Sequence, residues 1–300
     1  MAHQLPLSKT RLFIACSLLP LASFAHSDEF HAKLVAADQT LDMAPQSAIS
    51  IEGSKRIITG NGLPQHQVGQ FPNRGNPHEI TTQNKRYEVP LHPEIAAKPT
   101  ALSRQPWGVA VNGVPFDPGT AEYYKRDRNS IWNYEALSGQ VRLGLDTNHA
   151  HVQPSGAYHY HGLPTALFEQ LSGGQEQMTL VGWAADGFPL YGLYGYQDPT
   201  DSESALVTLK SSYRVKSGDR PTGDDSPGGS YDGTFTIDYE YVAGSGDLDA
   251  CGGRFGVTPE FPAGTYYYVL TNDYPFIPRM FKGTPDPSFE RKRGARPPAR

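Results

Sequence analysis

Two stretches, GVAVNGVPF at residues 108–116 and GWAADGFPL at residues 182–190, share the pattern Gly-x-Ala-x-Asn/Asp-Gly-Φ-Pro-Φ, in which Φ is apolar. Asn-Gly and Asp-Gly between short apolar runs are typical of two-residue type I′ hairpin turns, which need positive φ angles. The following proline cannot donate a hydrogen bond to a neighbouring strand, so it favours an edge or a bulge. The pattern predicts hairpins, and it makes Asp186 a turn residue, because Asn112 fills the same place.

The chain also resembles itself elsewhere, in three further pairs of segments that follow the same order. The pairs are residues 132–135 with 237–240, Leu145-Asp146 with Leu248-Asp249, and residues 154–161 with 262–269. Four blocks in one order indicate two related halves, about residues 105–165 and 180–275. A third Asn-Gly, at Asn61-Gly62, predicts a similar hairpin nearer the N-terminus.

Composition supports an all-β fold class. The 300 residues include 31 glycines, 26 prolines, 17 tyrosines and 13 phenylalanines, which favours many short strands joined by tight turns. We therefore expect a single β-rich domain of short strands and hairpins at residues 50–285, with the duplicated halves in a sandwich-like arrangement. Residues 26–49 are weakly patterned and are expected to have little structure, and residues 286–300 are expected to be a disordered basic tail.

The N-terminus has the features of an export signal. Lys9 and Arg11 precede an apolar stretch at residues 12–24, and Ser23-Phe24-Ala25 fits a cleavage site. Residues 1–25 therefore predict a signal peptide and a periplasmic or secreted protein. No later segment approaches the ~20 apolar residues of a membrane span. Acidic residues outnumber basic ones by 31 to 26, which argues against nucleic acid as a partner. After cleavage Cys251 is the only cysteine, and we expect it to be buried.

Histidines gather around a second kind of hairpin. His149 and His151 alternate with Ala150, and His159 and His161 alternate with Tyr158 and Tyr160. Each pair therefore faces one side of a strand. A three-residue loop at Pro154-Ser155-Gly156, with glycine in the left-handed position, would place residues whose numbers sum to 310 opposite each other. His151 then faces His159, and His149 faces His161.

Four imidazoles on one face predict a transition-metal site, because opposed Cβ atoms lie ~4.5–5.5 Å apart and bonds from nitrogen to a metal are ~2.0–2.1 Å long. The alternative is a polar sheet face of hydrogen-bonded histidines. Tyr158 and Tyr160 have counterparts in Tyr266 and Tyr268, whereas the histidines have none, so the tyrosines are read as architectural and the histidines as functional. Imidazole ligands suit Cu(II), Zn(II) or Ni(II). Asp146 fits either a turn or an acceptor that orients an imidazole.

At these residues the chain resembles the YHYH-domain family, named for the motif at Tyr158-His159-Tyr160-His161. The resemblance extends to Asn61-Gly62-Leu63-Pro64-Gln65-His66, Gly69-Gln70-Phe71-Pro72, residues 112–115, residues 148–151 and residues 182–192. It implies an exported protein of no settled activity. It also implies that His151, His159 and His161 are the usual residues, with His149 in a more variable place. His66 matches too and is a candidate ligand from a distant segment.

Three functions follow as hypotheses. The first is an exported protein that binds copper or zinc for metal handling or redox chemistry, with the metal ion as its partner. The second is a metal-dependent hydrolase or oxidase, since three protein ligands leave a position open for water or substrate, whereas four would close the site. The third is a surface ligand-binding module without metal, in which Trp107, Trp132 and Trp183 line a recognition face. The motifs of common hydrolases, nucleotide-binding proteins and zincins are absent from the sequence.

Overall fold

The computed structural model describes residues 32–291, and its regular secondary structure is mostly strands. Its centre is an eight-stranded sheet with the order β15-β16-β10-β9-β5-β6-β8-β7. Along the chain these strands are β5 (Gly108–Ala110), β6 (Pro115–Phe116), β7 (Ala150–Val152), β8 (Tyr158–Tyr160), β9 (Leu180–Ala184), β10 (Pro189–Tyr191), β15 (Gly253–Gly256) and β16 (Thr265–Val269). The predicted all-β class is confirmed.

The order of the strands reveals the duplication. β5 and β9 pair antiparallel at the centre, and the strands on either side correspond one to one. β6 pairs parallel with β8, where Phe116 lies opposite Tyr160, and β10 pairs parallel with β16, where Leu190 lies opposite Tyr268. The two tyrosine strands therefore occupy equivalent places, and the halves meet within one continuous sheet. The resemblance between residues 132–135 and 237–240 has no structural counterpart, because the first segment forms isolated bridges and the second forms a 3-10 turn and the start of β14 (Tyr239–Tyr241).

The hairpin turns are real, but their type differs from the prediction. Gly113 N donates to Ala110 O and Ala110 N donates to Val114 O, and Gly187 repeats this pattern with Ala184 and Phe188. Within each of these two turns only the glycine has a positive φ, +80° for Gly113 and +93° for Gly187. These are three-residue loops with a left-handed glycine at the end, and Asn112 and Asp186 keep ordinary φ angles.

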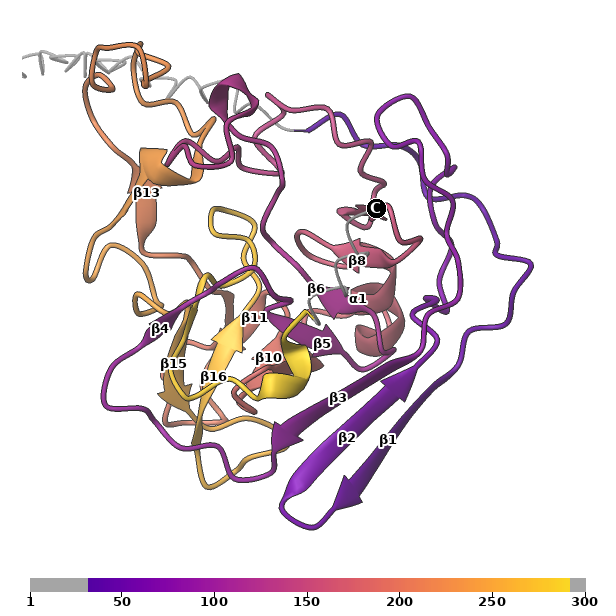
Figure 1. Ribbon diagram of the computed structural model, residues 1–300. Helices are drawn as coiled ribbons and strands as arrows, with labels where there is room; N and C mark the ends of the chain where they lie inside the picture. The colour runs from indigo at the N-terminus through magenta and orange to yellow at the C-terminus, as the bar shows by residue number, and fades with distance from the viewer. Residues whose placement is uncertain (1–31, 292–300) are drawn as a thin grey trace, which may run out of the picture.

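A separate three-stranded sheet covers one end of the molecule. It has the order β1-β2-β3, with β1 (Ser47–Glu52), β2 (Lys55–Gly60) and β3 (Lys85–Pro90), and Figure 1 shows the three side by side. The β1–β2 turn contains Gly53, so Asn61-Gly62 lies after β2 and not in a hairpin. Asn61 instead accepts from Gln46 N at 3.0 Å and donates to Ala44 O at 2.8 Å, which ties the N-terminal segment to the sheet.

The remaining elements are short. They are the strand pairs β4 (Thr100–Ala101) with β17 (Met280–Phe281), β11 (Tyr194–Tyr196) with β12 (Leu206–Thr208), and β13 (Tyr213–Val215) with β14, the helix α1 (Thr165–Ser172), and the 3-10 turns η1 (Tyr124–Arg126), η2 (Thr236–Asp238) and η3 (Pro287–Phe289). No helix of residues 32–291 is long and apolar enough to cross a membrane.

The segments expected to flank the domain, residues 26–49 and 286–300, both contain residues that contact it. Val35 bridges to Asp146 and Gln39 to Val68, which holds the segment before β1 against the domain. At the other end, Phe289 is buried and stacks on Tyr87 with 4.6 Å between ring centroids. The expected basic tail therefore does not begin at residue 286. The predicted signal peptide and residues 292–300 lie outside the described part of the chain.

Buried tyrosines stabilise each of the two halves in a matching way. Tyr158 donates to Asp146 at 2.7 Å, as Tyr266 does to Asp249 at 2.9 Å. Tyr160 accepts from Asn112 at 2.9 Å, and Tyr268 donates to Asp186 at 2.5 Å. Because a buried hydroxyl without a partner costs about 1–3 kcal/mol, these pairs explain why the tyrosines recur in both halves.

Candidate metal centre

The predicted histidine hairpin forms with the predicted register. His151 on β7 lies opposite His159 on β8, with Val152 opposite Tyr158 and Ala150 opposite Tyr160. Gly156 has a φ of +81° and closes a loop in which Gln153 N donates to Ala157 O. Turn and register therefore place His151, His159 and His161 on one side of the hairpin, and Tyr158 and Tyr160 on the other.

These three histidines, the histidine triad, form a nearly equilateral triangle. The ring centroids of His151 and His159 are 4.7 Å apart, those of His151 and His161 are 4.8 Å apart, and those of His159 and His161 are 4.7 Å apart. One ring nitrogen from each lies within 4.8 Å of the other two. The Nε2 atoms of His159 and His161 are 3.0 Å apart, close to the ~3.3 Å edge of a tetrahedron with metal bonds of ~2.0 Å.

Backbone carbonyls set the orientation of two of the rings. His151 Nδ1 lies 2.9 Å from Leu143 O, and His159 Nδ1 lies 3.2 Å from Ala157 O. A carbonyl oxygen can only accept, so Nδ1 carries the proton in both rings and Nε2 keeps its lone pair. Asn76 Nδ2 also lies 3.2 Å from His151 Nδ1, but this amide donates to Val152 O at the shorter distance of 2.9 Å. Metal-ligating histidines are held in the same way.

His161 shows how the triad behaves without a metal. Its Nδ1 is buried and forms no hydrogen bond of good geometry within residues 32–291, and the backbone of Pro118 acts only as a weak acceptor for this ring. Its Nε2 can donate to His159 Nε2, which leaves an unpaired acceptor at Nδ1. An ion bonded to both Nε2 atoms would replace this contact, so the residues present fit a transition metal.

Burial keeps the triad uncharged. Desolvation lowers the pKa of His151 to about 3 and that of His159 to about 4, and it holds the pKa of His161 well below 6.5. Neutral imidazole is the form that binds metal, so the rings are ready to ligate at neutral pH. Asp117, which is buried nearby, adds a negative charge on the His151 side.

His149 lies apart from the triad. Its φ is +53°, and it ends a three-residue loop in which its N–H donates to Asp146 O. This left-handed backbone turns the ring away, and its Nδ1 lies 2.8 Å from Leu163 O. Gly252, with a φ of +77°, holds the equivalent place in the other half. Period-two alternation therefore does not extend to His149.

His66 is also absent from the triad. It is buried on the tyrosine side of β8, with Nε2 2.8 Å from Tyr160 Oη and Nδ1 2.7 Å from Gln67 O. Both ring nitrogens are therefore engaged. Asp146 takes the turn role, because its carboxylate accepts from Asn148 N, Gly69 N and Tyr158 Oη and not from an imidazole.

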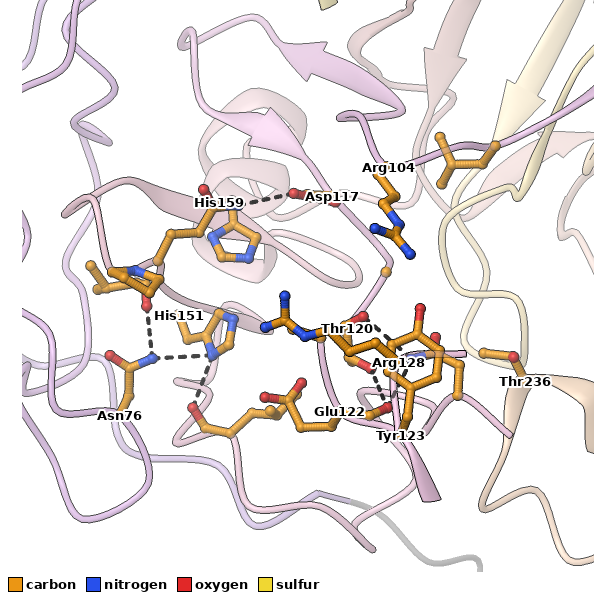
Figure 2. A pocket seen from close by; sticks show the side chains of 18 of the residues that line it. Asn76, Arg104, Asp117, Thr120, Glu122, Tyr123, Arg128, His151, His159 and Thr236 are labelled. Carbon is orange, nitrogen blue, oxygen red and sulfur yellow. Dashed lines mark hydrogen bonds between the residues drawn. The ribbon is translucent and has the colours of Figure 1, made fainter. Parts of the chain in front are cut away.

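One side of the triad opens into a cavity of about 940 Å³. His151 and His159 line it, whereas His161 lies behind them. Figure 2 shows Asn76 beside His151, and Asp117 near His159. The lining of the cavity also includes His78, Arg104 and Arg128. The sequence did not predict this lining, because its residues come from separate loops without a motif.

The three tryptophans do not line the cavity. Trp107, Trp132 and Trp183 are all buried, with exposed fractions of 0%, 4% and 6%. Cys251 is buried as expected, and burial raises the pKa of its thiol to about 11.

Comparison with known proteins places the motif in a family. No curated protein and no solved structure matches the chain. The family described as YHYH protein matches residues 86–283, which include the histidine triad and all eight strands of the central sheet. The chain therefore belongs to the YHYH protein family.

Proposed function

We propose that this chain is an exported protein that binds one Cu(II) or Zn(II) ion through His151, His159 and His161. The observation that carries the proposal is the triangle of neutral imidazoles, two buried and one half-buried, with ring centroids 4.7–4.8 Å apart. The Nε2 atoms of His159 and His161 face each other at 3.0 Å, where only one of them can donate, and an ion bonded to both would replace this contact. Three neutral nitrogen ligands suit these ions better than Ca(II) or Mg(II), which prefer oxygen.

The open side of the triad favours a reactive or exchanging ion over a closed structural one. A structural zinc site has four protein ligands, whereas three ligands leave room for water or another molecule. His149 and His66, the other histidines that the sequence offers as ligands, are both engaged elsewhere, and His78 lines the cavity on the open side near His151. The cavity beside His151 and His159 gives small molecules access to the vacant position. Bound to such an ion, water becomes more acidic and substrates are polarised.

The test is titration of chelator-treated protein with Zn(II) and Cu(II) by calorimetry. We expect one ion per chain for wild type, and affinities at least about 100-fold lower for His159→Ala and His161→Ala, since even outer-shell changes cost 10–100-fold. His92→Ala is the matched control, because His92 is exposed and outside the motif. Circular dichroism verifies that each variant is folded.

Two results bear directly on this proposal. Imidazole nitrogen couplings in the electron paramagnetic resonance spectrum of the Cu(II) form would support the ligand set. Wild type that binds no tighter than the His159→Ala/His161→Ala double variant would overturn it. Export rests on residues 1–25, and cell fractionation with N-terminal sequencing of the mature chain tests it separately.

A further inference from the structure

The cavity beside the histidine triad has an unusual charge for this protein. Its lining includes five arginines and two carboxylates, although the whole chain has a formal net charge of −5. The arginines are Arg104, Arg128, Arg142, Arg279 and Arg291, and the carboxylates are Asp117 and Glu122. A recess lined mainly by one sign of charge focuses the field and attracts ions of the opposite sign.

Two of the arginines already have acidic partners. Arg279 donates to Glu135 at 2.7 Å, and Arg291 donates to Asp117. Within residues 32–291, Arg104, Arg128 and Arg142 form no salt bridge. Their guanidinium groups are exposed and therefore keep their donors available to a ligand from solvent.

We propose that this cavity binds a small molecule with a carboxylate or phosphate oxyanion, held by Arg104 and Arg128 with Arg142 as a further cation. Guanidinium groups match such oxyanions because their N–H donors form two parallel hydrogen bonds. The cavity of about 940 Å³ is at the upper end of the range for small-molecule sites, so it has room for more than one anionic group.

The position of the arginines sets where the ligand lies. In Figure 2, Arg104 lies across the cavity from His151 and His159, and the Arg128 side chain extends over the cavity toward His151. A molecule held by its anionic end on Arg104 and Arg128 therefore lies beside the triad. This placement rests on the proposed function for the identity of the ion at the triad, whereas the anion site itself requires no metal.

The experiment uses metal-free, full-length protein and two probes, inorganic phosphate and succinate, followed by ³¹P NMR and calorimetry. We expect saturable binding of at least one anion, and a dissociation constant about tenfold higher for Arg104→Gln/Arg128→Gln. Arg126→Gln is the matched control for Arg128→Gln. Arg126 is an exposed arginine two residues away and does not line the cavity. Its substitution therefore removes the same charge as Arg128→Gln without removing a contact in the cavity.

The outcomes separate this inference from the metal proposal. A preference for phosphate over succinate assigns the site to phosphate groups, and the reverse assigns it to carboxylates. Equal losses in Arg126→Gln and Arg128→Gln, or no saturation by either anion at about 10 mM, would overturn the anion site. Zn(II) titration of the same arginine variants should give wild-type affinity, because none of these side chains belongs to the triad.

Discussion

The two outer hairpins of the central sheet, β15–β16 and β7–β8, have equivalent strand pairing but different side chains. In the β15–β16 hairpin, Arg254 lies opposite Tyr267 and donates to its hydroxyl at 2.7 Å and to Tyr196 O at 2.6 Å. In the β7–β8 hairpin, His151 and His159 fill these places. The first pair satisfies itself, whereas the second leaves ring nitrogens directed at a common point. A duplicated fold thus separates what the architecture needs from what the site adds.

Removing one ring should make the β7–β8 hairpin resemble the β15–β16 hairpin. Val269 holds the place of His161 in the other half, so His161→Val inserts a residue that this backbone already accepts. We expect the affinity for Zn(II) or Cu(II) to fall at least about 100-fold, with little change in the circular dichroism spectrum. Calorimetric titration measures the loss. Unchanged affinity would mean that His161 is not a ligand.

The tyrosine–aspartate pairs should differ in their contribution to stability. Asp146 is fully buried and accepts from Gly69 N as well as from Tyr158, whereas the side chain of Asp249 is 32% exposed. We expect Asp146→Ala to lower the free energy of unfolding by about 3 kcal/mol, and Asp249→Ala by about 1–2 kcal/mol. Urea unfolding of metal-free protein tests the order, and a larger loss at Asp249 would contradict it.

Acid should weaken the histidine half first. The folded-state pKa values of His159 and His161 lie below the unfolded value of ~6.5, so the unfolded chain binds more protons as the pH falls. The contribution of His159 is complete above about pH 6.5 and is lost as the pH falls toward about 4, and that of His161 falls in the same direction. Each histidine changes the free energy of unfolding by up to ~1.4 kcal/mol per pH unit in this window. We expect the free energy of unfolding of metal-free His161→Val, measured with urea between pH 6.5 and 4.5, to depend less steeply on pH than that of wild type.

The smallest effect is expected at the left-handed turn residue. Gly252 fills the position of His149, and glycine adopts positive φ without steric cost, so His149→Gly relieves about 1 kcal/mol of backbone strain. The lost contact with Leu163 O and the added chain entropy offset this gain. We expect thermal stability within about 1 kcal/mol of wild type and unchanged metal affinity. Loss of affinity would show that His149 reaches the ion.

Local pattern determined most of what the sequence predicted well. The register of the β7–β8 hairpin follows from Gly156 and from the alternation of histidine and tyrosine. The position of His149 could have been found as well, since the duplication aligns it with Gly252. The contact of His66 with Tyr160 and the arginines that line the cavity could not be predicted, because they depend on loops far apart in the chain that carry no periodic pattern.

The central pairing of β5 with β9 has a consequence for how such a site arises. A pair of identical subunits joined at these strands would be encoded by a single gene, so every substitution would appear at both ends of the sheet. Once both copies lie in one chain, each end can change independently. One hairpin can then accept three desolvated imidazoles while the other keeps a self-sufficient arginine–tyrosine pair and maintains the stability of the whole.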